Sequence, residues 1–221
     1  MKKLSAILTK QSVRKIFDIP RALYRPSNIL WYCLYFFFPR CNDFWYRTLL
    51  YWGKKTIYGE ISPSYITASP SQILHAKSCC NNSKIIIFLR DPVERVWSQM
   101  KLDYKNKEIN PNDVPANIMI ESTKNHLTRS TYIQSIQNWQ KVFGKQNLLI
   151  CDFKKISTEP LELLSHICSF LDIEFKESIF YQSAFANIFK GSNHVIPSNL
   201  KKYLEKILSE EISYYNQLTK V

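Results

Sequence analysis

The stretch that decides the fold is KIIIFLRDPVERVWSQM, residues 84–100. Its first part, Lys84–Arg90, is a continuous β-branched and apolar run, which is typical of a strand buried on both faces of a parallel sheet. A helix is predicted directly after it. Asp91 can serve as N-cap, Pro92 occupies the first helical position, and Glu94 stands three residues beyond the cap. The stretch therefore predicts a strand that leads straight into a helix.

The rest of the chain continues this alternation of strands and helices. Apolar residues at helical spacing follow the cap, at Val93, Val96, Trp97 and Met100. We expect an α/β fold, a parallel sheet flanked by helices, in one domain over residues 1–221. The further elements predicted from spacing and end signals are strands at 56–60 and 147–153, and helices at about 70–79, 132–143, 160–171 and 198–218.

The charge balance is strongly basic, with 30 Lys and Arg against 18 Asp and Glu and a net charge of +12. This excess favours an anionic partner, namely a phosphorylated nucleotide, an acidic polysaccharide, a nucleic acid or an anionic membrane surface. A generally basic, solvated surface is the plainer alternative, and charge alone does not decide between them.

Neither a membrane span nor a metal site is expected. The longest apolar run, Ile29–Pro39, is shorter than the about 20 residues that cross a bilayer. Basic residues interrupt the start of the chain, which argues against a cleaved signal peptide. The six cysteines have no paired CxxC spacing, so we expect reduced thiols in a cytoplasmic protein.

Three side chains are candidates for chemistry, because ligands of open α/β sheets bind at the carboxyl ends of the strands. Arg90 closes the clearest strand beside a helix N-terminus, and its guanidinium suits a phosphate. Ser98 lies off the apolar stripe and can add a donor. Glu60, at the end of the predicted strand 56–60, can act as a general base. The alternatives are that Arg90 pairs with Asp91 or Glu94, that Ser98 faces water, and that Glu60 is a solvated charge.

Three segments carry a resemblance to a known family. Residues 85–99, IIIFLRDPVERVWSQ, resemble the 3′-phosphate-binding strand and helix of the sulfotransferases that use 3′-phosphoadenosine 5′-phosphosulfate (PAPS). Residues 59–65, GEISPSY, resemble the catalytic-Glu segment of the carbohydrate-directed branch, which includes the heparan sulfate sulfotransferases. Residues 129–173 are similar to the later helix–strand–helix of the family. The resemblance covers roughly residues 42–175.

The resemblance implies a P-loop-NTPase-like fold and transfer of a sulfuryl group from PAPS to a carbohydrate-like hydroxyl. Arg90 and Ser98 would hold the 3′-phosphate of the donor, and Glu60 would be the general base. Lys190 and Gly191 could correspond to a late phosphate-contacting Lys-Gly pair, although an exposed loop lysine is the plainer interpretation. Neither a metal nor a nucleic-acid partner is expected.

One part of the family pattern has no counterpart here. The family holds the 5′-phosphosulfate in a Gly-containing, Ser/Thr-rich loop with a Lys, which follows an earlier strand. No glycine precedes Gly53 in this sequence, and residues 8–12, LTKQS, have a Lys and hydroxyls but neither a glycine nor a preceding strand. We therefore expect an N-terminally incomplete domain with little or no transferase activity, in which residues 1–52 form a helical, acceptor-side segment.

Two other functions stay open at this point. A non-catalytic descendant could keep the 3′-phosphate contacts and bind a nucleotide or a partner without chemistry. A basic protein that binds nucleic acids or membrane surfaces would fit the net charge and the aromatic and basic segment 21–47.

Overall fold

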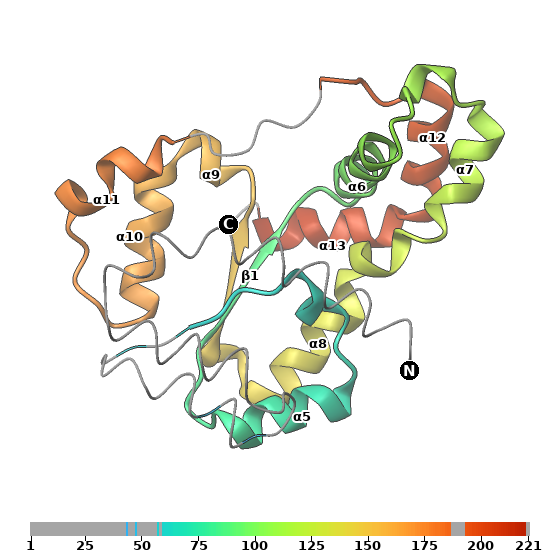
Figure 1. The fold of residues 1–221 in the computed structure, drawn as a ribbon. Coiled ribbons are helices and arrows are strands. Elements are labelled where there is room, and N and C mark those ends of the chain that lie inside the picture. Colours follow the sequence, from blue (N-terminus) through green and yellow to red (C-terminus); the bar gives the residue numbers. More distant parts are fainter. Residues whose placement is uncertain (1–42, 44–46, 48–56, 58, 187–192, 220–221) are drawn as a thin grey trace, which may run out of the picture. The chain divides into compact units, whose positions relative to one another are not determined.

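The computed structural model describes residues 43, 47, 57, 59–186 and 193–219 (Figure 1). The chain forms two compact units, Met1–Ile61 and Ser62–Val221. In the first unit Asp43 and Arg47 are helical. Most of the predicted helical segment 1–52, together with the Lys190-Gly191 pair, lies outside the described residues.

The second unit is built on a parallel pair of strands, β1 (Ile85–Leu89) and β2 (Leu148–Asp152), with Ile85 opposite Leu148 (Figure 1). Both strands were predicted, and each is one residue shorter at either end than expected. Within the described residues these two strands make up the whole sheet. A parallel pair needs a long crossover, and the helices between the two strands provide it.

The strand predicted at 56–60 is wrong at its three described positions, Ile57, Gly59 and Glu60, none of which is in a strand. A short alternating segment becomes a strand only when a neighbour completes its hydrogen-bond ladder. In the described part of the chain β1 and β2 pair only with each other. Glu60 is exposed and does not close a strand.

Helices pack on both faces of the sheet, as the sequence predicts. On one face, α5 (Pro70–Cys79) and α8 (Tyr132–Phe143) bury a cluster around Trp139 against Ile85 and Ile87. On the other face, α10 (Pro160–Phe170) packs against Ile86, Leu149 and Cys151. The expectation of complete burial is wrong for Phe88, which is 43% exposed because the cluster under α10 does not extend to it.

The helix after β1, α6 (Pro92–Asn106), begins at the predicted N-cap. The carboxylate of Asp91 accepts a hydrogen bond from the amide of Glu94 at 2.9 Å. The predicted apolar stripe is buried against α7 (Ala116–Thr123) and α12 (Ser198–Ile207). Cap and stripe together fix where the helix starts and which way it faces.

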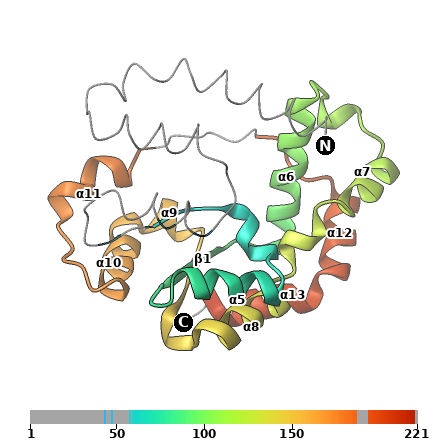
Figure 2. The same cartoon turned by 60° about the horizontal axis from the view of Figure 1, so that its bottom comes forward.

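The single helix predicted at 198–218 is in fact two helices, α12 and α13 (Ser209–Thr219), which meet at an angle at Leu208 (Figure 2). The two helices bury their apolar residues in different places. Leu204 and Leu208 pack in the cluster of α6, whereas Tyr215 packs in a cluster with residues of β1 and α8. A single straight helix could not bury apolar side chains in both clusters.

Six shorter elements complete the described chain: 3-10 helices η1 (Pro63–Thr67), η2 (Pro111–Asp113), η3 (Leu127–Ser130) and η4 (Lys145–Asn147), and helices α9 (Lys155–Thr158) and α11 (Glu177–Ala184). No helix in the described part of the chain is long and apolar enough to cross a membrane. The four described cysteines are free thiols.

Candidate functional site

Arg90 lies between the last residue of β1 and the cap of α6, and hydrogen bonds hold its backbone from two sides. The carbonyl of Leu89 accepts from the amide of Phe153, just beyond β2, at 2.7 Å. The carbonyl of Arg90 itself accepts from the Tyr132 hydroxyl at 2.8 Å. The backbone at the carboxyl end of β1 is therefore held in place, and it sets the direction in which the arginine side chain leaves the strand.

The Arg90 side chain is 33% exposed and makes two contacts with described residues. Its Nε lies 3.3 Å from a carboxylate oxygen of Glu94, which is the pairing anticipated as an alternative. Its guanidinium carbon lies 5.5 Å from the ring centroid of Phe153. An exposed ion pair of this kind contributes about 0.2–1 kcal/mol. Since the pair uses Nε and a guanidinium has five N–H donors, the terminal nitrogens can still bind an oxyanion.

Ser98 is half-buried on the same helix, four residues and so one turn beyond Glu94. Its hydroxyl makes no hydrogen bond within the described residues. Lys101 lies one turn further along α6, and burial and then the positive charge of Arg90 lower the pKa of Lys101. The structure thus places Ser98 and Lys101 on α6, the helix that follows Arg90. Sequence reasoning missed Lys101, although its spacing from Ser98 was a usable signal.

Two more arginines lie near this junction. Burial lowers the pKa of Arg95, and the positive charges of Arg129 and Arg90 lower it further, while Tyr132 acts in the opposite direction. The buried Nη1 of Arg95 has no hydrogen-bond partner in the described part of the chain. The carboxyl end of β1 is therefore a region of concentrated positive charge, which favours a multiply charged anion.

The N-terminus of α6 is less open to a ligand than the sequence indicates. Asp91 fills the cap position, and its carboxylate accepts the amide hydrogen of Glu94. A carboxylate here already satisfies part of the partial positive charge of the helix end. An anion at this junction would therefore be held mainly by side chains rather than by the free amides of the helix.

The structure does not test the positions of the other predicted site residues relative to this junction. Glu60 belongs to the first unit, whereas Arg90 and Ser98 belong to the second. Lys190 and Gly191 lie outside the described residues. The juxtaposition of Glu60 with Arg90 and the Lys-Gly contact both stay predictions.

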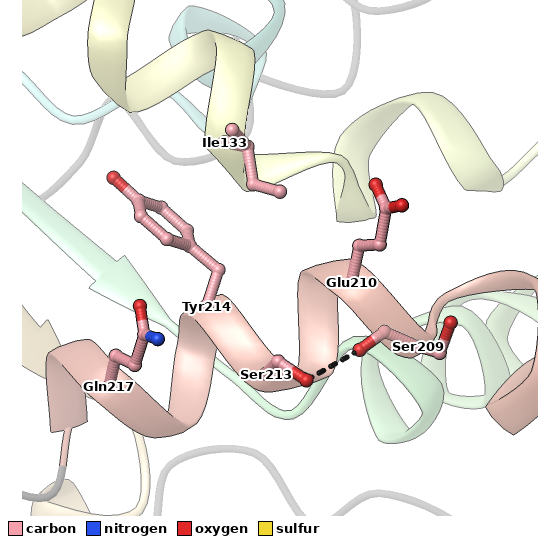
Figure 3. Close-up of a pocket in the computed structure, with 6 residues that line it drawn as sticks. All are labelled: Ile133, Ser209, Glu210, Ser213, Tyr214 and Gln217. Atoms are coloured by element: carbon pink, nitrogen blue, oxygen red, sulfur yellow. Dashed lines mark hydrogen bonds between the residues drawn. The ribbon is translucent and has the colours of Figure 1, made fainter.

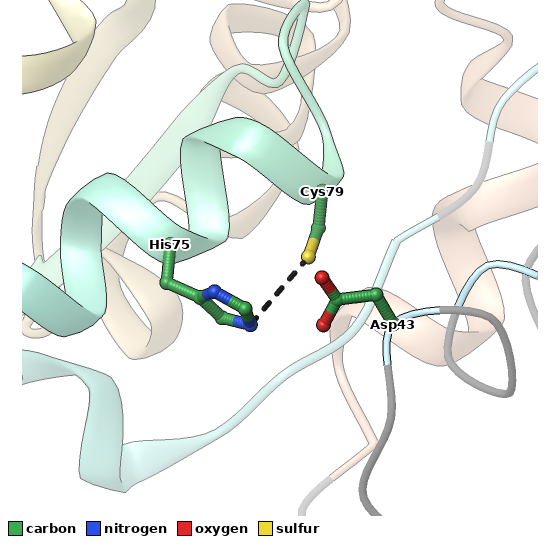
Figure 4. Close-up of side chains that lie close together, drawn as sticks. All are labelled: Asp43, His75 and Cys79. Atoms are coloured by element: carbon green, nitrogen blue, oxygen red, sulfur yellow. Dashed lines mark hydrogen bonds between the residues drawn. The ribbon is translucent and has the colours of Figure 1, made fainter.

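The second unit also has a groove and a pair of side chains of the type that can bind metals. A groove of about 360 Å³ between α8 and α13 contains no predicted site residue (Figure 3) and is lined by Ile133, Ser209, Glu210, Ser213, Tyr214 and Gln217. On α5, the sulfur of Cys79 lies 3.8 Å from Nε2 of His75 (Figure 4). These two side chains are fewer than the three or four that bind zinc in proteins, so by themselves they do not form a metal centre.

A parallel sheet covered by helices, with an arginine at a strand end, defines an α/β domain of the kind that places its ligand at the carboxyl ends of the strands. The chain belongs to the sulfotransferase family, because the model of the sulfotransferase domain matches residues 45–213. No curated protein sequence matches. The chain is similar in fold to a sulfotransferase from Alicyclobacillus acidocaldarius, with a TM-score of 0.58 and 17% identity over 84% of this chain and 74% of that one.

Membership confirms the family and fold class that the sequence predicts. The protein is a sulfotransferase by family, with an α/β fold of the P-loop-NTPase-like type. A domain of this family implies a sulfate-donor nucleotide and an acceptor. The match spans β1, α6, β2 and the first residues of α13, so the junction at Arg90 lies inside it.

Proposed function

We propose that the chain binds PAPS through its 3′-phosphate at Arg90 and Ser98, and that the family reaction here is directed to a carbohydrate-like hydroxyl. The observation that carries the proposal is the position of Arg90. It stands at the carboxyl end of β1, its backbone carbonyl is fixed by Tyr132, and its guanidinium has terminal donors beyond the contact with Glu94. A 3′-phosphate dianion fits this region, where Arg95 adds a positive charge.

The contacts of Arg90 and Ser98 with the 3′-phosphate are called the phosphate grip. It would form through side-chain hydrogen bonds, and only the weak pair of Arg90 with Glu94 would be lost. The terminal nitrogens of Arg90 donate to two phosphate oxygens, and the Ser98 hydroxyl donates to a third. Glu94 competes for the same guanidinium, but an exposed pair of this kind is worth at most about 1 kcal/mol. Charge-assisted hydrogen bonds to a phosphate contribute about 1.5–3 kcal/mol each, so the Arg90 guanidinium would bind the phosphate in preference to Glu94.

The transfer step assigns a role to Glu60. Its carboxylate accepts the proton of the acceptor hydroxyl while the hydroxyl oxygen forms a bond to sulfur and the bond from sulfur to the phosphate oxygen of the donor breaks. The leaving product is adenosine 3′,5′-bisphosphate. Lys190 and Gly191 would supply a further contact to the 3′-phosphate. The carbohydrate acceptor rests on the resemblance of residues 59–65 to the carbohydrate-directed branch.

The proposal also includes a low rate of sulfuryl transfer by this chain. No glycine precedes Gly53, so no Gly-containing loop with a Lys is available there to stabilise the leaving phosphate oxygen. Removing a single donor of that kind lowers a rate by about 10²–10³. The missing loop also favours a second candidate function: a non-catalytic member of the family that binds the nucleotide through the 3′-phosphate and does not catalyse transfer.

The experiment that tests the proposal is a thermal shift with adenosine 3′,5′-bisphosphate. The wild type should be stabilised, and Arg90→Ala should remove the shift. Lys145→Ala is the matched control, since it deletes an exposed cation from η4, at the opposite end of β2. No shift with the wild type, or an equal shift with Arg90→Ala, would count against the grip. Salt-sensitive binding of oligonucleotides that survives Arg90→Ala would favour the nucleic-acid alternative.

A further inference from the structure

We infer that Tyr132 is a positioning residue for the 3′-phosphate grip and that the C-terminal helix α13 is the brace that keeps it in place. This inference rests on the proposed function, because it assigns Tyr132 a role only if Arg90 binds the phosphate. It concerns residues that lie 42 and 121 positions beyond Arg90, at Tyr132 and Glu211, and that do not themselves reach the ligand.

The contact between Tyr132 and Arg90 is specific and buried. The phenol donates to the Arg90 carbonyl at 2.8 Å, and the tyrosine side chain is 2% exposed. Burial raises the pKa of Tyr132 to about 12, so the phenol stays protonated and keeps its hydrogen-bond donor at any working pH. Its ring packs in one cluster with Leu89, Ile136 and Tyr215. The phenol is therefore held in place independently of the arginine that it orients.

Tyr132 is the first residue of α8, and a carboxylate from α13 caps the start of that helix. Thr131, the residue at the N-cap position, makes no side-chain capping bond. Instead Glu211 accepts the amide hydrogens of Tyr132 and Ile133, at 2.6 and 3.0 Å. A carboxylate at this position both satisfies two free amides and interacts favourably with the helix dipole. Glu211 thus fixes the end of α8 that carries the phenol.

A second contact from α13 supports the other side of Arg90. The Tyr215 hydroxyl donates to the carboxylate of Asp152, the last residue of β2, at 2.9 Å. The next residue, Phe153, donates its amide to Leu89 and places its ring near the Arg90 guanidinium. One helix therefore secures both the segment that holds the Arg90 backbone and the segment that contacts its side chain.

Loss of the Tyr132 hydroxyl should therefore weaken binding of the 3′-phosphate and leave binding of the rest of the nucleotide unchanged. Removal of the Tyr132 hydroxyl leaves every charge in place and frees the backbone that aims Arg90. We expect Tyr132→Phe to weaken binding of adenosine 3′,5′-bisphosphate by about 3- to 10-fold, the range for loss of one neutral hydrogen bond. Adenosine 5′-monophosphate, which has no 3′-phosphate, should bind equally well to both forms.

Calorimetric titration of the full chain with these two nucleotides tests the inference. The measured quantity is the affinity for adenosine 3′,5′-bisphosphate divided by the affinity for adenosine 5′-monophosphate. Tyr132→Phe should lower the ratio about 3- to 10-fold, and Arg90→Ala should bring it close to one. Tyr214→Phe is the matched control and should leave the ratio unchanged. It removes a tyrosine hydroxyl from α13, where Tyr214 lines the groove (Figure 3). Glu211→Gln, which keeps an acceptor at the cap, should lower it about 2- to 5-fold and serves if Tyr132→Phe folds poorly.

The outcomes separate the inference from the proposed function. If Tyr132→Phe leaves the ratio unchanged, or weakens both nucleotides equally, Tyr132 has only a structural role and the inference is wrong while the grip at Arg90 stands. If the wild type does not prefer the nucleotide with the 3′-phosphate, the proposed function fails and the inference falls with it.

Discussion

Replacing Glu211 by Ala should destabilise the second unit by about 2 kcal/mol. The carboxylate accepts two amide hydrogens at the start of α8, at 2.6 and 3.0 Å. Loss of an N-cap acceptor costs about 0.5–2 kcal/mol, and loss of a carboxylate from a helix N-terminus about 0.3–1 kcal/mol. For a domain of this size, 2 kcal/mol corresponds to a fall in melting temperature of about 4–8 °C.

The control for this change is Glu210→Ala. Glu210 stands beside Glu211 in the first turn of α13 and is exposed, so both substitutions remove the same charge from the start of α13. Only Glu211 also caps α8. Urea unfolding followed by circular dichroism should show a clear fall in midpoint for Glu211→Ala and a small one for Glu210→Ala. Equal midpoints for the two variants would refute the capping role and the brace with it.

Three further predictions concern the site and its surroundings. Burial raises the pKa of Tyr132 to about 12 in the folded state, so between pH 10 and 12 this phenol ionises mainly in the unfolded chain, and its contribution to the free energy of unfolding falls across that window; urea titrations should show a shallower fall for Tyr132→Phe. Replacing Arg95 by Met should leave the melting temperature unchanged or raise it, because its buried Nη1 has no partner in the described residues. Ser98→Ala should weaken adenosine 3′,5′-bisphosphate about 3- to 10-fold in calorimetry and leave the 5′-monophosphate unaffected; equal losses for both nucleotides would contradict a 3′-phosphate contact.

Much of the fold could be predicted because its signals are local. The apolar run at 84–90 predicts β1 to within a residue at each end, and the cap at Asp91 predicts where α6 begins. The break at Leu208 could not be predicted, because helical periodicity continues through it and only the two separate clusters require a bend. The strand predicted at 56–60 failed for a related reason, since pairing depends on a neighbour that the segment itself does not reveal.

In the candidate site, too, the features set by local sequence could be predicted, and those set by long-range contacts could not. The position of Arg90 after β1 and that of Ser98 on α6 could be predicted because strand, cap and helix are contiguous, and so could the contact of Arg90 with Glu94 four residues away. The hydrogen bond from Tyr132 and the cap from Glu211 could not, because they join residues far apart in the chain and involve a backbone carbonyl and backbone amides. No pattern of side-chain types in a sequence identifies such partners.

The most direct test of the 3′-phosphate grip is ³¹P NMR of adenosine 3′,5′-bisphosphate, in which the two phosphates give separate signals. On addition of the protein, the 3′-phosphate signal should shift or broaden more than the 5′-phosphate signal, and Arg90→Ala should abolish the difference. A larger response of the 5′-phosphate, or a 3′-phosphate response that survives Arg90→Ala, would contradict a grip built on Arg90 at the end of β1.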